Sequence, residues 1–508
     1  MAVARVYTVQ PQVLQGTPVT IEADISRGLH AFSVVGLAGK AVDEAKDRVG
    51  SAIKHSGFAS PKSKNQKVVI SLAPADLKKD GPLFDLPIAV AYLIAAGDLH
   101  ADTQHRVLLG ELALDGSLRP VPGVLSCVLA ARAAGFQEVI VPEENAAEAA
   151  LVDGITTYGA ASLSAVIEHC SLASADKNTT LTVQPPTAIP DGWSESSVRL
   201  EDIKGQESAK RGLIIAAAGG HNVMLVGPPG TGKTMLARAL RGLIPPLTRE
   251  EALEVTSIHS LVDRSVTISA LPPFRAPHHT ASHTALVGGG TIPKPGEVTL
   301  AHRGVLFMDE FPEFERRSLD ALRQPLEDRV VTISRVQGTT EFPADFILVA
   351  ALNPYRGMED GTSDLAAAMH HTYQQKISGP ILDRIDLWLE VPHVDYDTLT
   401  NLPSKTDETA AARTAILTAR SQQRDRLGAG PGRQNANLSA REIESYITLS
   451  TDVQDVLRTA SAKLNLSPRS YHRLIKVTQT IADLERADAI QPAHVMEALQ
   501  YRVPSGAT

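Results

Sequence analysis

Cysteine is almost absent from this chain, which has only Cys127 and Cys170 among its 508 residues. Two thiols exclude a disulfide framework and a cysteine-rich zinc module. Long apolar runs are also lacking, so no segment is expected to cross a membrane. The residues from Met1 to Tyr7 have no signal-peptide architecture, and the sequence therefore predicts a cytoplasmic protein.

An excess of positive charge is missing as well. Asp and Glu number 57 against 49 Lys and Arg, which gives a formal net charge of −8. A surface with this balance does not attract nucleic acid as a whole. Any contact with nucleic acid must therefore be local, as in a ring whose lumen is lined by a few basic loops.

The chain does contain a phosphate-binding pattern. A single stretch fits G-x-x-x-x-G-K-[S/T], formed by Gly227, Pro228, Pro229, Gly230, Thr231, Gly232, Lys233 and Thr234. An apolar run precedes it and a helical pattern follows, so the loop is expected to turn its N–H groups and the positive end of a helix toward phosphates. Lys233 is expected to reach the β and γ phosphates of ATP, and the Thr234 hydroxyl is expected to bind Mg²⁺.

Two more apolar runs are predicted to form buried parallel strands with polar side chains at their carboxyl ends. The first run ends in Asp309 and Glu310, and the second ends in Asn353. Asp309 would hold Mg²⁺, and Glu310 would polarise the attacking water, so the chain is expected to hydrolyse ATP. Asn353 would lie between that water and the γ phosphate. An ordinary turn is the alternative for Asn353, because Pro354 follows it.

The remaining pattern predicts a multidomain α/β protein. In the first 170 residues, strands are expected at 19–25 and 67–72, helices at 40–56 and 86–96, and a strand pair or loop at 28–37. Residues 171–198 are rich in Ser, Thr, Asp, Asn and Pro, which is typical of a linker. From about residue 395 onward the pattern is helical, with helices at 406–426, after a capping box at Ser439, at 467–484 and at 491–502.

Part of the amino-terminal region resembles the protease domain of the Lon family (S5 domain 2-like). The resemblance rests on residues 80–82, 110–116 and 119–123, and it implies an α+β domain over residues 1–170. In that family a lysine activates a serine nucleophile, and the matching positions here are Leu83 and Leu125. Neither side chain can do this chemistry, so we expect a noncatalytic domain and no protease activity.

Residues 200–221 resemble the segment that leads to the phosphate loop in AAA+ ATPases. This resemblance implies an α/β core with a parallel sheet at 199–395 and an α-helical lid at 396–508. Arg384 would then be an arginine finger that acts on the γ phosphate of the neighbouring subunit, which requires a ring. An ordinary ion pair with Asp383 or Asp386 is the alternative. In the lid, Arg469 would be the sensor-2 arginine, with Arg473 as the second candidate.

Two inserted segments indicate which branch of the AAA+ ATPases the chain resembles. Residues 273–283 and 288–290 look like the helix-2 insert of the AAA+ branch that contains magnesium chelatase and the MCM helicases, and a hairpin is expected at 331–340, where that branch carries its pre-sensor-1 hairpin. Together with the Lon-like region, these segments make the chain similar to the ComM/YifB family of magnesium-chelatase-like ATPases over nearly its whole length. The resemblance implies a hexameric motor that translocates on DNA or drives branch migration, in homologous recombination and natural transformation. Its expected partners are branched or single-stranded DNA and recombination proteins.

In such a ring, the two inserts would bring side chains to a central pore. Arg275 and Arg335 are expected to contact phosphates, and Phe274, His278 and His279 are expected to stack on bases. A pair of packing loops is the alternative. A metal at the histidines of the first insert is not expected, because that loop has no thiolate or acid beside them.

The chain departs from the family at one point. The family often carries a cysteine cluster between Asn353 and Arg384, whereas residues 355–373 contain no cysteine, so a zinc site there is not supported.

The alternative to a DNA motor is a chelatase-type or chaperone-like ATPase that remodels a protein partner. Stimulation of ATP turnover by DNA would separate the two functions. That stimulation should fall as salt rises, because salt weakens contacts with DNA phosphates.

Overall fold

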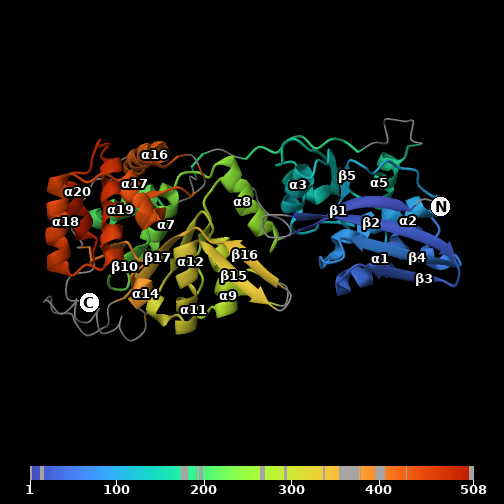
Figure 1. Ribbon diagram of the computed structural model, residues 1–508, viewed down its shortest axis with the longest axis horizontal. Helices are drawn as coiled ribbons and strands as arrows, with labels where there is room; N and C mark the ends of the chain where they lie inside the picture. Colours follow the sequence, from blue (N-terminus) through green and yellow to red (C-terminus); the bar gives the residue numbers. More distant parts are fainter. Residues whose placement is uncertain are drawn as a thin grey trace. The chain divides into compact units, whose positions relative to one another are not determined.

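The computed structural model describes residues 3–11, 16–172, 181–189, 192–193, 198–263, 269–290, 294–335, 338–353, 377, 379–394, 407–428, 430 and 432–502. The chain forms two compact units (Figure 1). The first comprises Met1–Pro190 and Ala252–Ser269, and the second comprises Asp191–Glu251 and Ala270–Thr508. Within the described ranges, no helix is long and apolar enough to cross a membrane.

The first unit is built on a mixed sheet. Its strand order is β3-β4-β2-β1-β5-β8-β9, with antiparallel pairs at β1/β2 and β2/β4 and parallel pairs elsewhere. The strands are β1 (Ala4–Pro11), β2 (Gly16–Arg27), β3 (Ala31–Val35), β4 (Gln66–Ala73), β5 (Arg106–Leu108), β8 (Glu138–Pro142) and β9 (Thr156–Ala160), and a small separate pair is formed by β6 (Glu111–Leu112) and β7 (Leu118–Arg119). The helices are α1 (Lys40–His55), α2 (Asp85–Ala96), α3 (Val124–Ala133), α4 (Ala146–Ala149) and α5 (Leu163–Cys170).

The predicted elements of this unit are confirmed. The strands at 19–25 and 67–72 lie within β2 and β4, and the helices at 40–56 and 86–96 match α1 and α2. The segment 28–37 contains a single strand, β3, at the edge of the sheet. Helix α2 is apolar on nearly all sides because it is buried against β1 and β2.

Leu83 and Leu125 are buried in the core of the first unit. They occupy the two positions at which the Lon resemblance would require a nucleophile and a base. Their burial explains why leucine suits both positions. The Lon-like character of the unit, with its boundary at residue 170, stays a prediction.

The second unit contains a five-stranded parallel sheet in the order β11-β14-β17-β10-β18. Three of its strands lie where buried strands were predicted. The strands are β10 (Val223–Val226), β11 (Phe274–Arg275), β14 (Val305–Met308), β17 (Ile347–Leu352) and β18 (Leu387–Glu390). Because every pair is parallel, all carboxyl ends meet at one edge and all amino ends at the other.

Helices and two inserts surround this sheet. The predicted hairpin at 331–340 is confirmed as the antiparallel pair β15 (Val330–Arg335) and β16 (Gly338–Pro343). The first insert contains α9 (His283–Val287), α10 (Glu297–Leu300) and the short pair β12 (Gly288–Gly289) and β13 (Lys294–Pro295). The other helices of this unit up to β18 are α6 (Glu207–Gly219), α7 (Lys233–Leu243), α11 (Arg316–Ala321), α12 (Arg323–Asp328) and α14 (Gly379–Leu382). Helix α8 (Arg249–Ser260) begins in the second unit and belongs to the first unit from Ala252 onward.

The carboxyl-terminal region is helical, as predicted. Ser439 and Glu442 form the expected capping box, and Ser467 caps a helix whose first residue is Pro468. The helices are α16 (Glu408–Leu427), α17 (Ala440–Tyr446), α18 (Thr451–Leu464), α19 (Pro468–Leu484) and α20 (Pro492–Gln500). Helices α16 and α19 pack against α6, so this region shares one hydrophobic core with the parallel sheet.

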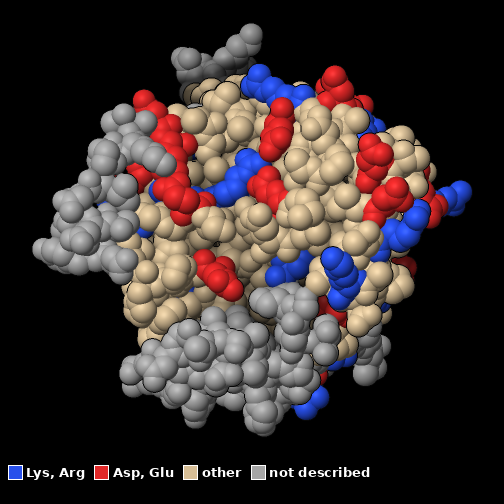
Figure 2. All heavy atoms as spheres, turned by 90° about the vertical axis from the view of Figure 1, so that its left-hand side faces the viewer, with Lys and Arg blue, Asp and Glu red and all other residues tan. Residues whose placement is uncertain are grey.

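Charges of both signs are interspersed on the face of the second unit that carries these helices (Figure 2). The described side chains on that face form no broad single-sign patch, which agrees with a formal net charge of −8. Attraction of a polyanion to this face as a whole is therefore not expected.

Candidate nucleotide-hydrolysis site

The phosphate-binding pattern at residues 227–234 joins the buried strand β10 to helix α7. Gly230 and Gly232 adopt φ angles of +82° and +91°, a left-handed backbone that other residues rarely adopt. At Gly227 the requirement is space, since a Cβ there would collide with the carbonyl oxygen of Val391. The glycines thus allow a tight loop at the carboxyl edge of the sheet.

The Lys233 ammonium lies within this loop. Its Nζ donates to the carbonyl oxygens of Gly227 at 2.8 Å and Pro228 at 2.6 Å. Burial lowers the pKa of Lys233, and the charge of Asp309 opposes that shift. A buried cation whose hydrogen bonds among the described residues go to carbonyl oxygens is well suited to receive an anion.

Hard oxygen donors lie next to the loop. Thr234 Oγ1 is 3.4 Å from Asp309 Oδ2, so the two predicted Mg²⁺ ligands are neighbours although 75 positions separate them in the chain. A hydroxyl and a carboxylate are ligands that suit Mg²⁺, with water and phosphate oxygens completing the shell. Asn353 directly follows β17, the strand between β14 and β10. Its buried Oδ1 has no hydrogen-bond partner among the described residues.

Glu310 directly follows Asp309 and has an unusual backbone. Its φ is +50°, in the left-handed region, and its N–H donates to Asp309 Oδ1 at 2.9 Å. Its carboxylate lies 3.2 Å from His279 Nδ1, and the His279 ring lies 4.1 Å from that of His278. The structure therefore places His279, a predicted DNA contact, beside the predicted catalytic glutamate.

The other predicted DNA contacts, Phe274, Arg275 and His278, differ in whether their side chains already contact other residues of the chain. Arg275 donates to both carboxylate oxygens of Glu297, at 2.6 and 2.7 Å, and Phe274 packs against Phe307. These contacts favour the packing alternative for Phe274 and Arg275. His278 is exposed and is hydrogen-bonded to Thr280 within its own loop.

Two predictions reach beyond the described residues. Arg335 is the last residue of β15, but its side chain is outside the described set. Residues 355–373, where the family often carries cysteines, also lie outside it.

Arg384 lies at the opposite edge of the sheet from the phosphate loop. It precedes β18, and its carbonyl oxygen accepts from Nδ2 of Asn222, which precedes β10, at 3.0 Å. A strand of four residues spans about 13 Å. Arg384 is therefore about a strand length away from the loop of its own chain.

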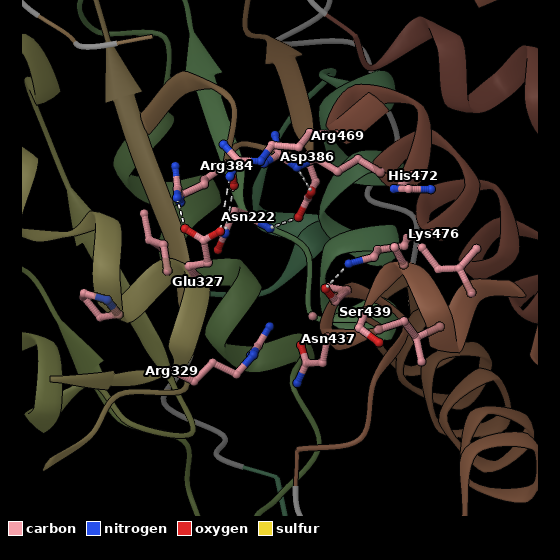
Figure 3. Close-up of a pocket in the computed structure, with 18 of the residues that line it drawn as sticks. Asn222, Glu327, Arg329, Arg384, Asp386, Asn437, Ser439, Arg469, His472 and Lys476 are labelled. Carbon is pink, nitrogen blue, oxygen red and sulfur yellow. Dashed lines mark hydrogen bonds and ion pairs between the residues drawn. The ribbon is translucent and has the colours of Figure 1, made fainter. Parts of the chain in front are cut away.

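The ion pairs at this amino edge differ from those expected. Arg384 pairs with Glu327 of α12, and within the described residues neither Asp383 nor Asp386 forms an ion pair with it (Figure 3). Arg469 Nη2 lies 3.4 Å from the same Glu327. Arg469 thus lies beside Arg384 at the amino edge.

The second sensor-2 candidate, Arg473, pairs with the buried Asp386 at 3.5 Å. Burial alone would raise the pKa of Asp386, but His221, whose Nδ1 lies 3.6 Å from Oδ2, and the charge of Arg473 hold that pKa below its usual value. Sequence reasoning missed Glu327 and the His221–Asp386 contact. The apolar periodicity of a short helix such as α12 carries no signal for Glu327, and His221 was noted only as the last residue of the segment 200–221 that resembles AAA+ ATPases.

Three family models match successive parts of the chain. They are described as "Subunit ChlI of Mg-chelatase" at residues 21–145, "Magnesium chelatase, subunit ChlI" at 199–399 and "Magnesium chelatase, subunit ChlI C-terminal" at 406–502. YifB of Salmonella typhimurium is 44% identical over 99% of this chain and 97% of that protein. Competence protein ComM of Haemophilus influenzae is also 44% identical, over 99% and 98%, and YifB of Escherichia coli is 42% identical over 99% and 97%.

These matches and the parallel sheet define an AAA+ module of the magnesium-chelatase type, a class that implies ATPase activity. The chain belongs to the ComM/YifB family of magnesium-chelatase-like ATPases.

Proposed function

We propose that this chain is an AAA+ ATPase that couples ATP hydrolysis to translocation on DNA or to branch migration, in homologous recombination and natural transformation. The observation that carries the proposal is the position of Arg384, at the sheet edge opposite the phosphate loop. An arginine finger so placed serves the ATP of a neighbouring copy, so the active form is a ring, as in a hexameric motor.

Within one subunit, the carboxyl edge of the sheet binds the nucleotide. Residues 227–234 cradle the phosphates, and Lys233 binds the β and γ phosphates. Thr234 and Asp309 would hold Mg²⁺, which neutralises charge on the phosphate oxygens when bound. Their 3.4 Å contact supports this pairing.

Glu310 accepts the proton of the attacking water, and the side chain of Asn353 orients that water against the γ phosphate. The buried Oδ1 of Asn353, which has no hydrogen-bond partner within the described ranges, supports this role. Arg384 and Arg469 act together on the neighbour's γ phosphate, since both lie at the amino edge on Glu327.

The DNA part of the proposal rests on local features. The hairpin β15–β16 ends its first strand with Arg335, and His278 is exposed on the first insert. One relative carries the name competence protein, which supports a role in DNA uptake or recombination. We assign residues 1–170 to a noncatalytic Lon-like domain, 171–198 to a linker, 199–395 to the ATPase core and 396–508 to the lid.

The rival function is remodelling of a protein partner. The magnesium-chelatase descriptions of the three matching family models favour it, because they span most of the chain. A protein remodeller would not need DNA for turnover.

The test is migration of a fluorescently labelled four-way DNA junction by the purified full chain, with ATP and with a nonhydrolysable analogue. We expect strand separation only with ATP, ATP turnover stimulated by the junction, and loss of this stimulation as salt rises. Lys233→Ala serves as the inactive control. Robust ATP turnover that is insensitive to DNA, with the junction left intact, would support protein remodelling instead.

A further inference from the structure

A basic pocket lies at the amino edge of the parallel sheet, between the core and the carboxyl-terminal helices (Figure 3). Its volume is about 480 Å³. Residues just before β10, β17 and β18 line it, which places it at the end of the sheet opposite the phosphate loop. Its charged lining consists of Arg329, Arg384, Arg469, Arg473, Lys476, Glu327 and Asp386.

Most of these charges have other partners. Asp386 is shared by Arg473 and His221, and Arg329 pairs with Asp345. Lys476 Nζ donates to the carbonyl oxygen of Ala436 at 3.0 Å. Glu327 is therefore the carboxylate of the lining that pairs with the remaining arginines, Arg384 and Arg469.

The Glu327 carboxylate joins arginines from two different elements. Arg384 Nη2 donates to Oε2, and Arg469 Nη2 from α19 lies 3.4 Å from Oε1. The side chain of Arg384 is 10% exposed, whereas Glu327 is 51% exposed. One negative charge thus faces two positive charges at the open mouth of the pocket.

The Arg384 guanidinium has one further N–H group that could donate a hydrogen bond. The buried Nε of Arg384 has no partner among the described residues, although its two terminal nitrogens bond to Glu327 and to the Pro380 carbonyl oxygen. A carboxylate offers two oxygens, whereas a terminal phosphate offers three and carries more negative charge. Guanidinium groups bind both kinds of anion through the same donors.

We propose that Glu327 occupies the place at which Arg384 and Arg469 receive the terminal phosphate of ATP bound to a neighbouring copy of this chain. Glu327 is then a built-in competitor that raises the protein concentration needed for ring assembly and hydrolysis. This inference rests on the proposed function, since it requires Arg384 to act on a neighbour's nucleotide. It adds a residue that keeps an isolated subunit's arginines neutralised until a loaded neighbour arrives.

The test is ATP turnover per subunit as a function of protein concentration for the wild type, Glu327→Gln and Glu327→Ala. We expect the half-maximal concentration to fall by about fivefold in both variants, which corresponds to one partly exposed ion pair. The plateau turnover should stay close to that of the wild type. Asp328→Asn is the matched control, because Asp328 is an exposed acid on the same helix and does not line the pocket, so its half-maximal concentration should not change.

An unchanged or higher half-maximal concentration in both folded Glu327 variants would overturn the proposal, with circular dichroism establishing that each is folded. Arg384→Ala separates this failure from failure of the proposed function. If Arg384→Ala abolishes turnover while the Glu327 variants behave as wild type, the competitor role alone is wrong. If Arg384→Ala keeps full turnover, the shared ATP site is wrong.

Discussion

At the scale of single residues, we propose that Glu310 carries the hydrolytic step. Its backbone is left-handed, its N–H is fixed by Asp309, and its carboxylate contacts His279 rather than Lys233. A strained residue held by its neighbours at a strand end is typical of a catalytic position. In the proposed site, the phosphate-binding groups and the proton acceptor are therefore separate side chains.

Glu310→Gln keeps the size of the side chain and removes its basicity. We expect ATP binding and ring assembly to persist while turnover falls by about 10²-fold to 10⁴-fold, the usual contribution of a general base. Binding of a fluorescent ATP analogue and release of phosphate measure the two effects. Lys233→Ala should lose both, and loss of ATP binding in Glu310→Gln would contradict the role of Glu310.

The polar residues at strand ends were predictable from sequence because an apolar run and its terminal acid or amide are adjacent in the chain. Asp309, Glu310 and Asn353 are of this kind. Two contacts were not predictable from sequence. Glu327 and Arg384 are 57 positions apart in the chain, and His279 and Glu310 are 31 positions apart, so only the folded sheet brings each pair together.

At the scale of elements, the amino terminus of α2 is held by a buried ion pair. Arg48 of α1 donates to both Asp85 oxygens, at 2.7 and 3.0 Å, and Asp85 also accepts from the N–H of Leu112. Burial raises the pKa of Asp85 to about 6, and Arg48 opposes that rise only in part. Because the folded state holds this proton more tightly than the unfolded chain, Asp85 makes the unit less stable as pH rises through about 6.

Arg48→Met would leave the Asp85 carboxylate buried without its cation. We expect a loss of about 3 kcal/mol at pH 7.5 and a smaller loss at pH 5, where Asp85 is protonated and needs no partner. Hydrogen exchange of peptides that cover α2 measures this locally. Arg5→Met, which removes an exposed pair with Glu22, is the control and should have little effect at either pH. An equal loss at both pH values would contradict the pKa assignment.

The positions of helices and strands could be predicted from the sequence more accurately than the order of strands in the sheets. The helices beginning at Lys40 and Pro468 follow from apolar periodicity and capping residues, and the hairpin at 331–340 was expected from the resemblance to the magnesium-chelatase branch of AAA+ ATPases. The strand order β11-β14-β17-β10-β18 depends on pairing between distant segments, for which no local pattern exists. The return of Ala252–Ser269 to the first unit had no signal in the sequence either.

For the whole molecule, we propose that the two edges of the parallel sheet have different tasks. The carboxyl edge carries Lys233, Asp309 and Glu310, and the amino edge carries Arg384 and Arg469. One subunit cannot bring its two edges together around one nucleotide, because the sheet lies between them. The proposed head-to-tail ring would solve this, since each interface would join the carboxyl edge of one copy to the amino edge of the next.

Mixing two inactive variants tests this shared site most directly. Lys233→Ala subunits lack a working phosphate loop, and Arg384→Ala subunits lack the finger. In mixed rings about a quarter of the interfaces would pair an intact loop with an intact Arg384, so we predict turnover of roughly that fraction of wild type from two preparations that are each inactive alone. Turnover that stays at background after mixing, with light scattering showing that mixed rings have formed, would contradict an ATP site built by two subunits.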